Sequence, residues 1–252
     1  MGAAMDLPEL IRLHGNSVPV EQVRAANTMS MDEFRRAAEA DRERTRELLA
    51  RDAGSAEERA QRLLEEATRA AGIPERFAHV PVDRRFARRM RDGRGLYVWG
   101  ETGGNGKTSA ACAAARGWIA EGGRGTRFVP CVAMLDDCRS AMTDGRGEGS
   151  VTSGYATARL LVVDDVGKEA PSPWTLAKLF EIADRRYGAM LPTVWTSQLS
   201  PAGLAERLAS RGDELTAQAV ASRIVDSCDV IEDRGADRRL ESRNVRRGDG
   251  RS

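Results

Sequence analysis

Five short apolar runs follow one another along the chain after residue 95. They are 96–100 (LYVWG), 127–131 (RFVPC), 159–165 (RLLVVDD), 191–197 (LPTVWTS) and 228–232 (CDVIE). Runs that are apolar at consecutive positions are typical of strands buried on both faces. The connections between them are long enough for helices, and strands that alternate with helices form a parallel sheet. The pattern predicts an α/β fold with a five-stranded parallel sheet flanked by helices.

Residues 31–70 are different, because charged residues dominate and apolar positions are sparse. The pairs Ser30 with Glu33 and Ser55 with Glu58 have capping-box spacing, which predicts two helices. The apolar positions are Phe34, Leu48, Leu49, Leu63 and Leu64. So few apolar side chains favour two solvated helices with narrow buried faces. A module that docks on a partner is the alternative, since such faces bury little within their own chain.

The segment 71–74 (AGIP) breaks the helical pattern and indicates a domain boundary. We therefore expect a small helical N-terminal region over 1–72, which would dock on a partner, and an ATPase core over 73–236. The tail, 237–252, is rich in arginine and is expected to be a flexible, solvated end.

Composition excludes several classes of protein. The net charge is +1, so contact with a nucleic acid would depend on local basic patches. No apolar run is long enough to span a membrane, and the N-terminus lacks the features of a signal peptide. The cysteines have neither zinc-site spacing nor the density of a disulfide framework: Cys112, Cys131, Cys138 and Cys228. We expect a cytoplasmic protein.

The first apolar run leads into residues 100–108, GETGGNGKT, and then into a helical stretch. A glycine-rich loop between a strand and a helix presents backbone N–H groups to the phosphates of ATP. Lys107 would reach the β- and γ-phosphates, and the Thr108 hydroxyl would bind Mg²⁺. The other residues expected to line the phosphates are Gly100, Gly103, Gly104, Asn105 and Gly106.

The spacing of this loop is unusual. The standard motif has its first glycine six residues before the lysine, a position that Glu101 occupies here, and Gly100 lies one residue earlier. Either the loop contains one extra residue, which Gly103 absorbs, or Glu101 replaces the first glycine. We favour the extra residue, because Gly100 still lies where the strand must end.

Three later segments contribute candidate catalytic groups. The run at 159–165 ends in Asp164, expected to hold Mg²⁺, and Asp165, expected to polarise the attacking water. The run at 191–197 is followed by Gln198, which either orients that water or is simply a polar residue at the end of the strand. Arg223 either completes the site of a neighbouring subunit as an arginine finger or is an ordinary exposed arginine.

In these segments the chain resembles the AAA+ helicase-loader family of the DnaC/DnaI type and its relatives, the IstB transposase-helper ATPases. The resemblance covers residues 72–232 and rests on the order of AGIPERF, GLYVWGETGGNGKT, RLLVVDDVGKE, DRRYGAMLPTVWTSQ and SRIVDSCDVIE. Two departures are Gln198, where asparagine is usual, and Ser227, where some relatives carry a second arginine. Only 20 residues follow the fifth apolar run, so we expect no C-terminal lid domain of the kind that many AAA+ proteins have.

The resemblance implies a P-loop core, an N-terminal region that grips a replicative helicase, and ATP-dependent contact with single-stranded DNA. We therefore expect a slow, Mg²⁺-dependent ATPase that loads a replicative helicase and forms a homo-oligomer with ATP. Basic segments at 84–94 and 139–146 are candidate DNA contacts. A transposase helper and a nucleotide-gated adaptor with little hydrolysis are the alternatives. A small-molecule kinase is disfavoured, because no arginine-bearing lid is evident.

Overall fold

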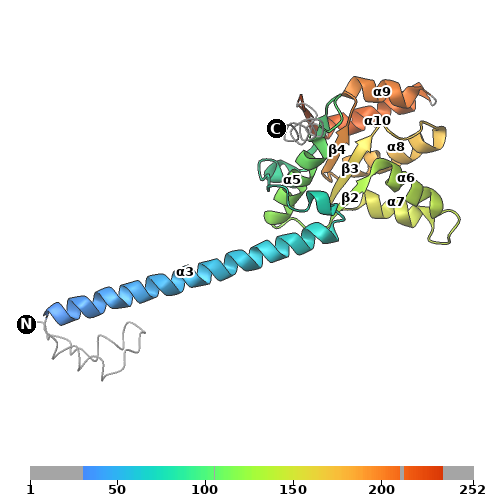
Figure 1. Cartoon of the computed structure of the whole chain (residues 1–252). Helices are drawn as coiled ribbons and strands as arrows, with labels where there is room; N and C mark the ends of the chain where they lie inside the picture. Colours follow the sequence, from blue (N-terminus) through green and yellow to red (C-terminus); the bar gives the residue numbers. More distant parts are fainter. Residues whose placement is uncertain (1–30, 105, 211–212, 235–252) are drawn as a thin grey trace, which may run out of the picture. The chain divides into compact units, whose positions relative to one another are not determined.

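A five-stranded, all-parallel sheet forms the centre of the unit made by residues 61–252 (Figure 1). The structure is a computed structural model, and it describes residues 31–104, 106–210 and 213–234. The strands are β1 (Gly95–Trp99), β2 (Thr126–Pro130), β3 (Leu160–Val166), β4 (Thr193–Ser197) and β5 (Cys228–Glu232). Their spatial order is β2-β3-β4-β1-β5. The predicted fold class and all five predicted strands are confirmed, to within two residues at each end.

Helices cover both faces of the sheet, as Figure 1 shows. On one face lie α4 (Ala87–Arg91) and α5 (Lys107–Ala120), preceded by the short 3-10 helix η1 (Glu75–Phe77). On the other face lie α6 (Cys131–Ser140), α7 (Glu148–Ala156), α8 (Pro173–Gly188), α9 (Pro201–Ala209) and α10 (Glu214–Asp226). The central strands β3, β4 and β1 therefore lie between two helical layers, whereas Val230 of the edge strand β5 is 45% exposed.

The two layers explain why the strands are apolar at consecutive positions. In β1, Leu96 and Val98 pack in the core on the α5 side, whereas Tyr97 packs on the α8 side. In β4, Val194 and Trp195 divide in the same way. Because successive side chains of a strand point to opposite faces, both sets must be apolar when both faces are covered.

Residues 31–70 form one helix, α3 (Met31–Ala70), and the prediction of two helices is wrong. Ser55 lies inside this helix instead of capping a new one. A single Gly54 costs a helix only about 1 kcal/mol relative to alanine, and the surrounding Ala, Arg, Glu and Leu residues favour helix. No proline interrupts the segment, so the helix continues. The other predicted cap, Ser30, lies outside the described residues.

The chain consists of two compact units, residues 1–60 and 61–252, so the last turns of α3 belong to the second unit. In those turns Leu64 is 8% exposed and Thr68 is buried, whereas Leu63 is 65% exposed. The helix thus buries a narrow face, as expected. It ends at Ala70, followed by Gly72 with φ of +77° and then by Pro74, which confirms the predicted break at 71–74.

A buried arginine, Arg186 of α8, holds several chain segments together. Its guanidinium donates to four backbone carbonyls and one hydroxyl, those of Tyr155, Ala156, Ala158, Pro192 and Thr193. Burial lowers the pKa of Arg186 to about 10, so the side chain is still charged at neutral pH. Arg186 therefore ties the end of α7 to the segments that lead into β3 and β4.

The four cysteines are free and buried, as small apolar side chains in a core are. Burial raises the pKa of the Cys112 and Cys228 thiols to about 12. Every helix in the described part of the chain is too short or too polar to cross a lipid bilayer. The predicted tail at 237–252 lies outside the described residues.

Candidate nucleotide site

The predicted phosphate loop connects the end of β1 to the start of α5. The backbone N–H of Gly100 donates to the Ser197 carbonyl, 3.2 Å away, and α5 begins at Lys107. Gly104 and Gly106 have φ of +81° and +118°, a region that residues with a Cβ rarely adopt. These glycines let the loop turn back on itself before the helix. Asn105 lies outside the described residues.

The Lys107 ammonium lies within the loop rather than in solvent. It donates to the carbonyls of Gly100 and Thr102 at 2.7 and 2.9 Å, and the residue is 5% exposed. Burial lowers the pKa of Lys107, and the charges of Asp165, Asp233 and Asp164 oppose that shift. A cation held among backbone groups at the N-terminus of a helix can bind phosphate oxygens in place of the carbonyls.

The contact between Lys107 and Gly100 bears on the unusual spacing of the loop. Gly100 directly follows the last residue of β1, so it occupies the position where the loop leaves the sheet. Glu101 is exposed to solvent. This arrangement supports the interpretation that Gly100 is the first glycine of the loop and that one extra residue follows it.

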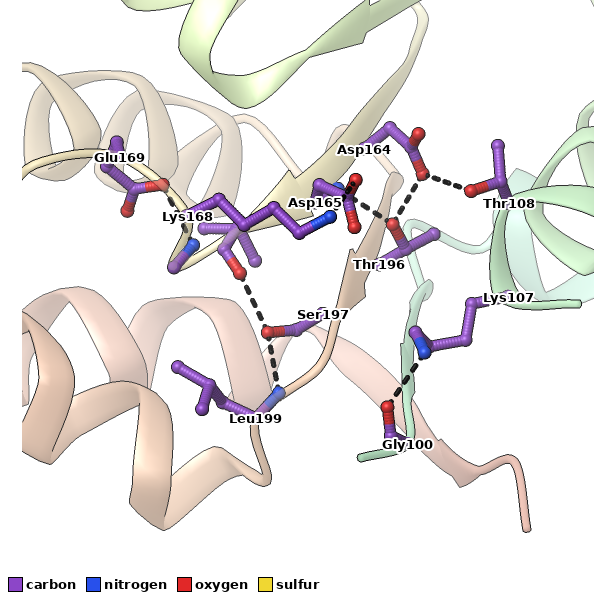
Figure 2. Close-up of polar contacts among 12 residues, drawn as sticks. Gly100, Lys107, Thr108, Asp164, Asp165, Lys168, Glu169, Thr196, Ser197 and Leu199 are labelled. Atoms are coloured by element: carbon purple, nitrogen blue, oxygen red, sulfur yellow. Dashed lines mark hydrogen bonds and ion pairs between the residues drawn. The ribbon is translucent and has the colours of Figure 1, made fainter. Parts of the chain in front are cut away.

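Asp164, at the carboxyl end of β3, lies against the first turn of α5. Its Oδ1 accepts hydrogen bonds from the hydroxyls of Thr108, at 2.9 Å, and Thr196, at 2.6 Å (Figure 2). Burial raises the pKa of Asp164, and the two hydroxyls act in the opposite direction. The structure thus brings together Thr108 and Asp164, the two residues that the sequence assigned to Mg²⁺.

Asp165 lies at an irregularity in the pairing of β3 with β4. The register shifts between Val163 and Val166, and Asp165 has φ of +61°, which is uncommon for a residue other than glycine. Its N–H donates to the Thr196 hydroxyl at 2.8 Å instead of to a carbonyl of the next strand. The bulge turns Asp165 away from the regular pleat, and Thr196 compensates for the lost ladder bond.

Thr196 lies in the polar end of the predicted strand, where the sequence analysis selected Gln198 and gave Thr196 no role of its own. It is fully buried, and its hydroxyl contacts both acids, donating to Asp164 and accepting from the Asp165 amide. The sequence did contain a signal for it: two consecutive hydroxyl residues, Thr196 and Ser197, end the predicted strand. In the structure this strand, β4, pairs with β3, which carries the two acids. The second hydroxyl residue, Ser197, donates to the Val166 carbonyl at 2.7 Å and so supports the same bulge.

Gln198 follows β4 and borders the phosphate loop. Its Nε2 lies 4.0 Å from the position that a Cβ on Gly103 would occupy. Gln198 is thus near the loop, and a Cβ at position 103 would be in ordinary van der Waals contact with it.

The structure does not bring Arg223 to the phosphate loop of its own chain. Arg223 lies in the last turn of α10, just before β5, at the amino ends of the parallel strands. The phosphate loop lies at their carboxyl ends, about 16 Å away along a strand of five residues. The Arg223 Nε donates to Asp184 at 2.8 Å, and its guanidinium lies 4.8 Å from the centre of the Tyr187 ring.

The basic segments that were candidate DNA contacts are extensively paired with acids of the same chain. Within 84–94, arginines form ion pairs with Asp83, Glu121 and Asp229. Within 139–146, Arg139 pairs with Asp136 and stacks on Trp174, and Arg146 pairs with two aspartates. The charge of both segments is therefore partly neutralised.

Comparison with known proteins identifies the family. The sequence profile of the IstB-like ATP binding proteins matches residues 25–245, which include the whole sheet and the phosphate loop. The chain belongs to the IstB-like ATP-binding family. None of the curated proteins with which the chain was compared matches it.

Solved structures show the same fold as this IstB-like protein. One is the crystal structure of the DnaC helicase loader, with 20% identity and a TM-score of 0.53; the match covers 64% of this chain and all of that one. Another is the crystal structure of DnaI, with 25% identity and a TM-score of 0.51, covering 59% of this chain and 81% of that one. The predicted resemblance to this group of AAA+ proteins is confirmed, and the family supports nucleotide binding.

Proposed function

We propose that this IstB-like protein is a Mg²⁺-dependent ATPase whose site lies between the phosphate loop, β3 and β4. The 2.9 Å contact between Thr108 and Asp164 carries the proposal. It joins a hydroxyl and a carboxylate from two separate segments beside the Lys107 ammonium. Oxygen ligands of this kind suit Mg²⁺, which usually binds through one or two protein ligands together with the phosphates of its nucleotide.

Each side chain has a separate role in this proposal. The loop amides and Lys107 hold the phosphates, and Thr108 and Asp164 hold the metal ion, which neutralises charge on the phosphates. Asp165 accepts a hydrogen bond from the attacking water and aligns it with the γ-phosphate. Gln198, beside Gly103, would help to orient the same water.

Steady-state turnover of ATP tests this assignment. The full chain is assayed with and without Mg²⁺ and compared with Asp165→Asn, which preserves the size of the side chain and removes its charge. We expect Mg²⁺-dependent turnover that the substitution reduces by at least about a hundredfold. Binding without turnover in the unmodified chain would instead support a nucleotide-gated adaptor.

Arg223 suits a role between subunits in this proposal. Since it lies at the opposite end of the sheet from its own phosphate loop, it could only reach the site of a neighbouring copy. We propose that ATP promotes a homo-oligomer in which Arg223 leaves Asp184 and approaches the γ-phosphate of the next subunit. Light scattering with ATP, compared with Arg223→Ala, tests this step. Turnover should rise with protein concentration only when Arg223 is present.

We further propose that the cellular role is to load a replicative helicase onto single-stranded DNA. The solved structures with this fold include one described as a helicase loader, and α3 carries Leu49 and Leu63, which are 66% and 65% exposed. Exposed leucines on a polar helix suit contact with another protein. A transposase is the alternative partner, since the chain belongs to the IstB-like family and resembles the IstB transposase-helper ATPases.

Co-purification of the full chain with a replicative helicase and, separately, with a transposase distinguishes the two roles. The double variant Leu49→Asp/Leu63→Asp should no longer co-purify with whichever of the two proteins is the partner, and it should retain ATP turnover. Met190, which is also strongly exposed but lies outside α3, provides the matched control Met190→Asp. If the chain co-purifies with the transposase and not with the helicase, the proposed role in helicase loading is wrong and a role in transposition takes its place.

Contact with single-stranded DNA is part of the same proposal. Exposed ion pairs contribute only about 0–1 kcal/mol each, so phosphates can compete with Asp83 or Glu121 for the arginines of 84–94. Binding of an oligonucleotide of mixed sequence should therefore weaken steeply with salt, and in this proposal it also requires ATP, as the resemblance to helicase loaders implies. Binding independent of both would contradict it.

A further inference from the structure

The turn after β3 places the Lys168 ammonium on the carboxylate of Asp165. The Lys168 Nζ lies 2.7 Å from Asp165 Oδ2, and the Lys168 N–H points back to the Asp165 carbonyl at 3.4 Å. Figure 2 shows the lysine side chain extended toward the acid. The side chains are 48% and 35% exposed. An ion pair between such exposed groups contributes little to the stability of the fold.

The backbone that carries Lys168 is nevertheless held from several sides. The buried Glu169 accepts a hydrogen bond from the Gly167 N–H at 2.8 Å. From α9, Arg207 donates to the carbonyls of Gly167 and Glu169 at 3.3 and 3.4 Å. These contacts fix the residues on both sides of Lys168.

Gly167 adds a steric constraint to this turn. Its φ is +94°, and a Cβ at this position would lie 2.8 Å from Leu199 Cδ1. The left-handed backbone favours glycine at this position, and with this backbone the Lys168 side chain reaches Asp165. The ion pair thus extends from a turn whose backbone Glu169 and Arg207 hold on both sides of Lys168.

We infer that Lys168 is a positioning residue that restrains Asp165 in the isolated protomer. The inference rests on the proposed function, in which Asp165 accepts a hydrogen bond from the attacking water. While the ammonium occupies Oδ2, that oxygen is a poorer acceptor for water and the carboxylate is held toward the turn. Turnover then requires the carboxylate to leave Lys168, so the lysine keeps basal hydrolysis slow without affecting ATP binding.

Three single variants of the full chain test the restraint: Lys168→Met, Lys168→Arg and Lys178→Met. Lys168→Met removes the charge and retains the length of the side chain, and we expect kcat to rise about two- to fivefold, the range that a partly exposed ion pair allows. KM for ATP should not change. Lys168→Arg keeps a cation beside Asp165 and should keep the slow rate. Lys178→Met removes an ammonium that pairs with Glu148 and Glu181 and should have no effect on kcat.

The possible results separate this inference from the proposed function. If kcat of Lys168→Met is unchanged or lower while its melting temperature is normal, the restraint is refuted. A change in KM alone would refute it as well, because it would place Lys168 in ATP binding. In the double variant Lys168→Met/Asp165→Asn, the rise in kcat seen for Lys168→Met should be absent. If Asp165→Asn alone hydrolyses ATP normally, the assignment of Asp165 fails and the restraint fails with it.

Discussion

Thr196 and Asp164 are joined by a 2.6 Å hydrogen bond in which the threonine hydroxyl donates to Oδ1. The same hydroxyl accepts the N–H of Asp165 at 2.8 Å. Because a hydroxyl has a single hydrogen to donate, these two bonds fix its orientation. One buried side chain of β4 therefore positions both acids at the end of β3, and a change there should affect both without touching the phosphate loop.

Thr196→Val removes this hydroxyl and nearly preserves the shape of the side chain. We expect a ten- to hundredfold loss of Mg²⁺ affinity or of turnover, roughly the effect of removing a group that orients a metal ligand. Titration of the Mg²⁺ dependence of ATP turnover measures it. Thr196→Ser keeps the hydroxyl and should retain most of the activity. If Thr196→Val is as active as the unmodified chain, the β-bulge positions Asp164 and Asp165 without the threonine hydroxyl.

Lys107→Ala should abolish ATP binding. The Lys107 ammonium is the buried cation of the loop, and a charge-assisted bond to phosphate is about twice as strong as a neutral one. We expect affinity to fall by a factor of about 100 or more, measured by calorimetry with ATP. Retained affinity in a folded variant would mean that the loop at 100–108 is not the nucleotide site.

Arg186→Met should destabilise the fold by about 3–5 kcal/mol, because it leaves several buried carbonyls without a donor. Denaturant unfolding measures the loss. The adjacent Arg185→Met is the control: Arg185 is partly exposed and pairs with Glu181, so its removal should change stability by less than about 1 kcal/mol. Similar losses in the two variants would contradict the role assigned to Arg186.

Gly117→Ala should destabilise the core by about 1–3 kcal/mol through overpacking. A Cβ on Gly117 would lie 1.9 Å from the Asp83 carbonyl oxygen, so either α5 or the 83–84 segment must move. Gly188→Ala, at the end of α8, has no atom within 4 Å of the new Cβ and should be neutral or slightly stabilising. Thermal melting of both variants provides the comparison.

The buried thiols should report on unfolding. Burial raises the pKa of Cys112, Cys131, Cys138 and Cys228, and a thiol rather than a thiolate reacts slowly with disulfide reagents. We expect negligible labelling of the native protein and complete labelling in denaturant. Rapid labelling of one native cysteine, identified by mass spectrometry, would show that its surroundings open locally.

The sheet could be predicted from the sequence because burial on both faces demands apolar residues at consecutive positions of each strand. The phosphate loop and the two acids could be predicted because their chemistry requires particular residues at the ends of strands. The positions of Thr196 and Lys168 could not, because a β-bulge and a left-handed turn determine where those side chains point. Likewise, nothing local distinguishes Arg186 from Arg185, although one is buried and the other is not.

The continuity of α3 also escaped prediction. Capping boxes describe where a helix can begin, and they do not force the preceding residues to stop being helical. At Ser55 the helix-forming residues on both sides outweigh one local signal. The sequence pattern predicted the strands well, because burial on both faces determines which residues they contain. It predicted the extent of α3 less well, because only local helix preferences act there.

The separation of Arg223 from its own phosphate loop has a consequence for symmetry. A contact that joins the amino edge of one sheet to the carboxyl edge of another uses two different surfaces, so it cannot be a two-fold dimer in which both partners contribute the same patch. In the proposed oligomer, every copy is therefore joined head to tail, and an open assembly has an unused site at one end and an unused arginine at the other. Such an assembly has a direction, and on a DNA strand, which is itself directional, it could bind in only one of two orientations.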